Sequence, residues 1–111
     1  MIERGDKIPS GLPMFIQMIR FNKEFSIAGV EAELLCGIGE KMDRKISSRF
    51  KMSMGYTNGS QTYLPDKTEY KRGGYEVHSH IIFALPFPLS SVMEDIVLDT
   101  TAEMNKKLFG R

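Results

Sequence analysis

The hydrophobic pattern of this chain changes its period near residue 32, and this change constrains the possible folds more than any other feature. Two apolar, β-rich segments, residues 14–21 and 24–31, are separated by Asn22 and Lys23, a two-residue spacing that predicts a β-hairpin. In the next stretch, AELLCGIGEKMDRKI, apolar residues recur every three or four positions, which predicts a helix with one buried stripe. The fold must therefore combine a sheet with helices.

The rest of the chain adds one strand pattern, a long loop and a second helix. Residues 49–56 alternate apolar side chains with polar or small ones, which predicts a half-buried strand. Residues 77–85 are either a last strand or an extended segment that ends before the prolines of the PFP sequence. Ser91 and Glu94 have the spacing of a capping box, and Gly110 is placed to end the helix that follows.

The predicted order of elements is thus β-β-α-β-loop-α, with an optional strand after the loop. This order indicates an α/β fold, with mixed α+β as the alternative, in which a small sheet is flanked by two helices. The core of such a fold is thin, and an irregular loop of about 20 residues inside a compact domain is usually functional or packed against another element. We therefore expect residues 1–111 to form a single domain or a fragment of a larger α/β domain. A homo-oligomer or a missing N-terminal catalytic portion would equally supply the absent packing.

Composition limits the classes of partner and compartment. Fifteen Lys and Arg residues against fourteen Asp and Glu residues leave a net charge of +1, so we expect no nucleic-acid partner. The single cysteine, Cys36, cannot form an internal disulfide, and its place among apolar helix positions predicts a buried core residue. No apolar run approaches the ~20 residues of a transmembrane helix, and residues 1–10 are too polar for a secretory signal. The localisation stays open.

Three groups of side chains are candidates for chemistry. Glu31 and Glu33 lie where the second strand gives way to the helix, in an otherwise apolar stretch where a carboxylate needs a partner or a metal ion. Glu33 is alternatively a first-turn helix residue favoured by the helix dipole. His78 and His80 form an H-x-H pair, and on a strand both side chains lie on the same side, where both imidazoles can reach one metal ion. Alternatively, they are two polar residues on a strand edge.

The third group is a tyrosine-rich loop. All four tyrosines of the chain lie in the stretch GYTNGSQTYLPDKTEYKRGGYEV, together with four glycines. The glycines permit backbone conformations closed to other residues, so the loop can fold back on itself. Tyrosine hydroxyls that converge in this way bind a metal ion or stabilise an oxyanion; alternatively, the rings anchor the loop by packing.

Several of these motifs are similar to a known family. The carrying features are a two-strand segment followed by GVEAE, a helix, a strand that ends in GYTN, and then YLPDKTEY and GGYEV. In this arrangement the chain resembles the C-terminal part of the catalytic region of neutral/alkaline, non-lysosomal ceramidases and their bacterial relatives. That family has P-G-E after the strand, a G-Y-x-N strand end, a Y-x-[TP]-T/D-x-x-x-Y segment and a closing Y-E. The resemblance covers residues 13–108 and is most specific over residues 55–77.

The resemblance implies a zinc-dependent amidase, because family members of known activity cleave the N-acyl bond of ceramide. It implies that Glu33 and Tyr63 are zinc ligands and that Tyr75 lies at the active site beside the scissile amide. The other zinc ligands in the family are two histidines from earlier in its chain. Carboxylate and phenolate oxygens suit zinc, which activates water and polarises a carbonyl group.

The chain also departs from the family pattern. Glu31-Ala32-Glu33 stands in place of P-G-E, and Pro65-Asp66 follows the ligand tyrosine. The family's upstream histidines and serine have no counterpart here, and His78 and His80 do not match them. We therefore expect the C-terminal segment of a zinc amide hydrolase acting on a lipid amide or other small-molecule substrate, inactive by itself. Alternatives are a stand-alone, non-catalytic α/β binding module that uses the Tyr/Gly-rich loop, and a small metal site of His78, His80 and Glu33.

Overall fold

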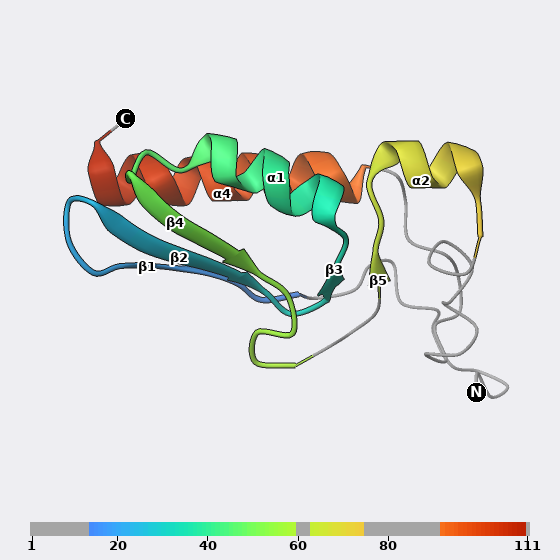
Figure 1. Cartoon of the computed structure of the whole chain (residues 1–111), viewed down its shortest axis with the longest axis horizontal. Helices are drawn as coiled ribbons and strands as arrows, with labels where there is room; N and C mark the ends of the chain where they lie inside the picture. Colours follow the sequence, from blue (N-terminus) through green and yellow to red (C-terminus); the bar gives the residue numbers. More distant parts are fainter. Residues whose placement is uncertain (1–13, 60–62, 75–91, 111) are drawn as a thin grey trace, which may run out of the picture.

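The computed structural model describes residues 14–59, 63–74 and 92–110. Strand β1 (Ile16–Arg20) pairs antiparallel with β2 (Phe25–Val30), which confirms the predicted hairpin. The connection comprises residues 21–24 and is thus longer than the predicted two-residue turn. Within it, Asn22 Oδ1 accepts hydrogen bonds from the backbone N–H groups of Glu24 and Phe25. Strand β4 (Phe50–Met54) runs parallel to β2 and completes a three-stranded sheet in the order β1-β2-β4 (Figure 1).

Two helices, α1 (Cys36–Lys45) and α4 (Met93–Phe109), lie side by side over the same face of this sheet (Figure 1). The core between the two layers consists of fully buried apolar side chains from β2 and from both helices, among them Ala28, Val30, Ile38, Met42 and Val97. The predicted helical stripe is confirmed in its C-terminal part, where Ile38, Met42 and Ile46 are buried. The fold is a small mixed sheet with helices, a mixed α+β arrangement.

A second, two-stranded sheet lies beyond the C-terminal ends of β2 and β4. Strand β3 (Glu33–Leu34) pairs in parallel with β5 (Tyr63–Leu64), and helix α2 (Lys67–Arg72) follows β5. Part of the stretch predicted as an irregular loop is therefore ordered. Asp66 caps α2 by accepting a hydrogen bond from Glu69 N at 2.9 Å, and an Asp-x-x-Glu sequence is a recognisable helix start.

The predicted start of the first helix is wrong by several residues. Ala32, Glu33 and Leu34 belong to the periodic stretch, but α1 begins at Cys36 because the preceding backbone pairs with β5 instead. Cys36 is exposed at this first helical position, not buried as predicted. The helix turns its buried stripe, Ile38 and Met42, toward the sheet, and Cys36 lies two positions from Ile38 on another side of the helix.

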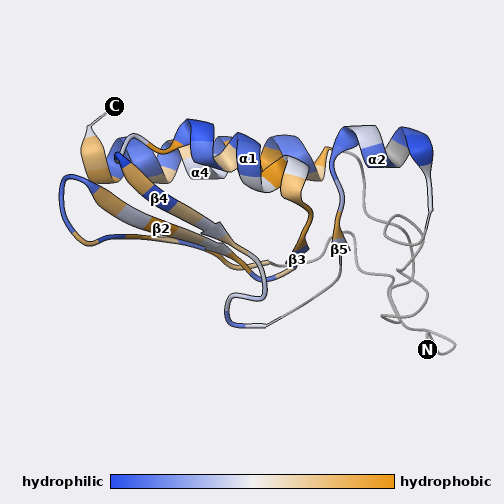
Figure 2. Ribbon diagram, in the orientation of Figure 1, coloured by the Kyte–Doolittle hydropathy of each residue, from blue (hydrophilic) through white to orange (hydrophobic). Residues whose placement is uncertain are grey.

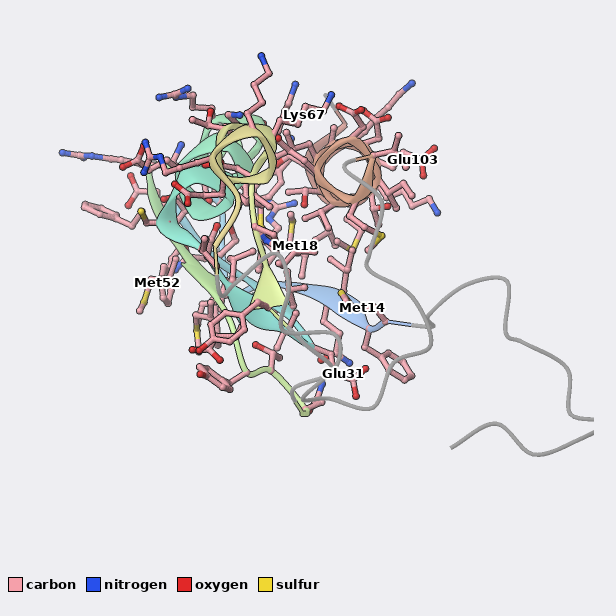
Figure 3. All side chains as sticks on the ribbon, turned by 90° about the vertical axis from the view of Figure 1, so that its right-hand side faces the viewer. Met14, Met18, Glu31, Met52, Lys67 and Glu103 are labelled. Carbon is pink, nitrogen blue, oxygen red and sulfur yellow. The ribbon has the colours of Figure 1, made fainter. Side chains whose placement is uncertain are left out.

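The strand β4 also has the opposite orientation from the one that its pattern suggests. Phe50, Met52 and Met54 are 41–55% exposed, whereas Lys51 and Ser53 point toward the helices. Ser53 Oγ donates to Asp43 Oδ1 at 2.6 Å, and Lys51 Nζ donates to Ile46 O at 2.9 Å. Figure 3 shows Met18 between the sheet and the helices and Met52 on the opposite side of the sheet.

We call the uncovered side of the three-stranded sheet its open face. The register aligns Ile19 with Ile27 and Ile27 with Met52 across it, and Phe25 with Phe50 in the next row. Figure 2 shows apolar residues recurring along β2 and β4, whereas the helices are mostly hydrophilic. Among the residues that the structure describes, no element covers this face; both long helices pack on the other side.

The buried side of α4 is unusually polar. Its buried residues are Glu94, Val97, Thr101 and Asn105, and the predicted apolar residue Ile96 is half exposed. Glu94 forms an ion pair with Lys41 of α1, and its second oxygen accepts a hydrogen bond from Lys67 N at the start of α2. Glu94 therefore joins three helices. The N-cap of α4 is Val92, and Ser91, the other residue of the predicted capping box, lies outside the described residues. Over the described ranges, no helix combines the length and apolarity needed to span a bilayer.

Candidate functional site

The two predicted zinc ligands are brought together by the β3–β5 pair. Glu33 and Tyr63 are direct partners in this parallel ladder, as are Leu34 and Leu64. Partners in a parallel sheet lie about 4.8 Å apart and direct their side chains to the same face. Glu33 and Tyr63 are both partly exposed. Leu64 is fully buried, so the opposite face of the β3–β5 pair packs in the core. The carboxylate and the phenol are therefore neighbours on one accessible face.

A third oxygen donor, Tyr56, joins this pair and was not predicted as a site residue. The Tyr56 hydroxyl donates a hydrogen bond to the Glu33 carboxylate, and this bond is the largest cause that raises the pKa of Tyr56 from 10.0 to about 12. Partial desolvation and the charges of Glu33 and Tyr63 raise the pKa further in the same direction. Tyr56 was not predicted as a site residue because strand alternation assigns it to the same face as Met52 and Met54.

The backbone around Tyr56 explains how the residue reaches Glu33. Tyr56 has a φ of 53°, a left-handed conformation that is uncommon for a bulky residue. Its N–H donates to Ala32 O at 2.8 Å, and the next N–H, of Thr57, donates to Val30 O at 3.0 Å. At Gly55, a Cβ atom would lie 2.8 Å from Ala32 O, so only glycine permits this close approach to the residues that precede Glu33.

Glu31 has a different environment from Glu33. One carboxylate oxygen of Glu31 accepts a hydrogen bond from Phe15 N at 3.2 Å, and a Cβ atom added at Gly59 would lie 2.9 Å from the other oxygen. Figure 3 shows Glu31 on the side of the sheet away from the helices. Tyr75, His78 and His80 lie outside the described residues, so their predicted roles stay predictions. Tyr70 lies on α2.

The donor set suits zinc as part of a site. Glu33 and Tyr63 offer two oxygen ligands, but a zinc site requires three or four protein ligands with at least some nitrogen or sulfur in most proteins. Within residues 14–59, 63–74 and 92–110, no three His, Cys, Asp or Glu side chains cluster as a metal-binding group. Glu33 and Tyr63 therefore fit a shared site, in which further ligands come from outside the described residues.

Comparisons of the chain with protein-family models, with curated proteins and with solved structures find no match in any of the three.

Proposed function

We propose that this chain is the C-terminal segment of the catalytic region of a zinc-dependent amide hydrolase. In this proposal it supplies Glu33 and Tyr63 to a zinc site completed by residues outside the chain. The observation that supports the proposal most directly is the pairing of Glu33 with Tyr63 across the β3–β5 ladder. These residues are distant in sequence, and the resemblance to neutral ceramidases selected the same two as ligands.

Each residue has a distinct proposed task. Bound zinc would activate water and polarise the amide carbonyl. Glu33 offers a carboxylate whose orientation is restricted by its hydrogen bond with Tyr56. Tyr63 is held by the strand β5, whose other residue, Leu64, is anchored in the core. Tyr75 is proposed as the active-site hydroxyl beside the scissile bond, and the proposed substrate is a lipid amide of the N-acyl sphingosine type.

The uncovered apolar side of the sheet gives independent support for a larger catalytic region. All-parallel sheets normally have both faces covered, and β2 and β4 form the parallel part of this mixed sheet. A second wall packed on the open face would bury Phe50, Met52 and Met54. It would also bring further residues near the C-terminal end of β4, beside Tyr56 and Glu33.

The test uses the complete gene product that contains this chain, loaded with zinc and assayed for release of fatty acid from N-acyl sphingosine. We expect Glu33→Gln to lower kcat/KM about 100-fold or more, in line with the loss of a metal ligand or its close partner. Glu40→Gln is the matched control, because Glu40 is an exposed glutamate on α1 away from β3. Zinc content, measured by atomic absorption, should fall in Glu33→Gln and not in the control.

Two results would contradict the proposal. One is full activity and full zinc content in Glu33→Gln. The other is amide hydrolysis, or tight zinc binding, by the 111-residue chain alone, because two ligands hold zinc weakly.

The second candidate function is a non-catalytic binding module, and the exposure of Tyr56 favours it. Tyr56 is 61% exposed, and exposed tyrosines on a rigid scaffold are common in recognition surfaces. In that case Tyr56→Ala would weaken binding of the partner while Glu33→Gln would not change it. A complete gene product without zinc or hydrolase activity would favour this module.

A further inference from the structure

The segment that follows β4 makes contacts that a simple connecting turn does not need. A Cβ atom added at Gly55 would lie 2.8 Å from Ala32 O and 3.0 Å from Leu34 N, and the N–H groups of Tyr56 and Thr57 donate hydrogen bonds to Ala32 O and Val30 O. These contacts fix the turn to the backbone on both sides of Glu31. They also place Tyr56 directly beside the strand that carries Glu33.

Tyr56 adopts its conformation at an energetic cost. A non-glycine residue in the left-handed region is energetically unfavourable, and such residues persist where the surrounding structure holds them. Continued strand alternation would direct Tyr56 to the open face with Met52 and Met54. The left-handed turn at φ 53° ends this alternation, and the hydroxyl meets the Glu33 carboxylate.

A hydrogen bond at this point has a specific consequence for a glutamate ligand. A free glutamate side chain samples several rotamers, and it loses this conformational entropy when the carboxylate binds a metal ion in one orientation. Ligating carboxylates are commonly held by a hydrogen bond to a neighbouring residue, and loss of that neighbour weakens metal affinity about 10–100-fold. A hydrogen bond from Tyr56 restricts the Glu33 side chain in the same way, next to its ladder partner Tyr63.

We propose that Tyr56 is a positioning residue that holds the Glu33 carboxylate in one orientation beside Tyr63, ready to bind a divalent metal ion. The metal-binding part rests on the proposed function, whereas the orientation of Glu33 does not. Tyr56 acts through Glu33 in this proposal and is not itself a metal ligand.

The first experiment measures the orientation of Glu33 in the metal-free 111-residue chain by NMR. Three-bond couplings from Glu33 Cγ to the backbone N and carbonyl C report whether its χ1 angle is fixed or averaged. We expect single-rotamer couplings in the wild type and averaged couplings in Tyr56→Phe, which removes only the hydroxyl. Thr57→Val is the control, because it removes the neighbouring hydroxyl, which bonds to Gly55 O and not to Glu33. Wild-type couplings in a folded Tyr56→Phe would overturn the proposal.

The second experiment titrates the same variants with Zn²⁺ and follows the Glu33 carboxyl ¹³C and Tyr63 ring signals. We expect Tyr56→Phe to weaken Zn²⁺ binding about tenfold or more, and to have no further effect in a Glu33→Gln background. Equal affinities for the wild type and Tyr56→Phe would overturn the metal-binding part. Averaged couplings in Tyr56→Phe, together with Zn²⁺ binding that Glu33→Gln does not weaken, would retain the positioning role and contradict the proposed function, because Glu33 would then not be a ligand.

Discussion

Tyr56 combines an exposed ring, a left-handed backbone and a hydrogen bond to a carboxylate. Each feature depends on the others, because the backbone conformation directs the hydroxyl and the hydroxyl bonds to Glu33. The neutral phenol is the form that donates this hydrogen bond. Ionisation of Tyr56 would replace the bond with repulsion between two anions, and this explains why its pKa is raised.

The raised pKa of Tyr56 predicts a pH dependence. The folded pKa of about 12 lies above the ordinary value of 10.0, so the stabilising contribution is complete below about pH 10. It is lost as the pH rises through about 12. The difference in tyrosinate absorbance between the wild type and Tyr56→Phe isolates this titration. We expect its midpoint near 12 in the wild type and closer to 10.0 in Glu33→Gln; an unchanged midpoint in Glu33→Gln would refute the role of the carboxylate.

At the scale of elements, the contact between β3 and the turn after β4 predicts opposite effects for two Gly→Ala substitutions. In Gly55→Ala the new Cβ would lie 2.8 Å from Ala32 O, so the backbone must move, which destabilises the fold by about 1–3 kcal/mol. In Gly39→Ala the Cβ would meet only Leu34 at 3.7 Å, and alanine in a helix is more favourable than glycine by about 0.5–1 kcal/mol.

Urea unfolding of the two variants checks this prediction. The free energy of unfolding should fall in Gly55→Ala and rise in Gly39→Ala. Equal changes in the two variants would show that the close approach of Gly55 to Ala32 is not a constraint.

The elements differ in how far the sequence could predict them. The hairpin and the buried stripe of α1 follow from clear periodicity, and the structure confirms both. Strands β3 and β5 have two residues each, too few to show a period, so the pairing of Glu33 with Tyr63 was reached only through the family resemblance. The alternation in β4 identified two faces, but the apolar face that it suggested as buried points away from the helices. The hydrogen bonds of Lys51 to Ile46 and of Ser53 to Asp43 hold the polar face of β4 toward the helices, and the alternation within β4 does not reveal them.

At the scale of the whole molecule, the described residues form two layers, with helices on one side of the sheet and an apolar surface on the other. The large exposed apolar side chains of β1, β4 and their ends on the open face are Phe15, Ile19, Phe21, Phe50, Met52 and Met54. Each of them is 41–64% exposed, whereas the exposed apolar side chains of a monomeric protein are normally scattered singly. Such a surface indicates an interaction, because isolated soluble proteins seldom expose one of this size.

The open face therefore predicts that the isolated chain self-associates. Ile19 and Met52 flank Ile27 in one cross-strand row, so Ile19→Lys or Met52→Lys places a charge at the centre of the face. We expect the wild type to show concentration-dependent association in sedimentation equilibrium and to enhance the fluorescence of an apolar dye. Each variant should lower both signals.

Ile96→Lys is the matched control, because Ile96 is 50% exposed on α4, on the helical side of the molecule. All three positions are half exposed, so the lysine side chains remain solvated and the free energy of unfolding should change by about 0.5 kcal/mol or less. Ile96→Lys should leave association and dye binding unchanged. Equal reductions in all three variants would show a general effect of added charge. A wild type that stays monomeric and binds no dye would show that the open face is not an interaction surface in the isolated chain.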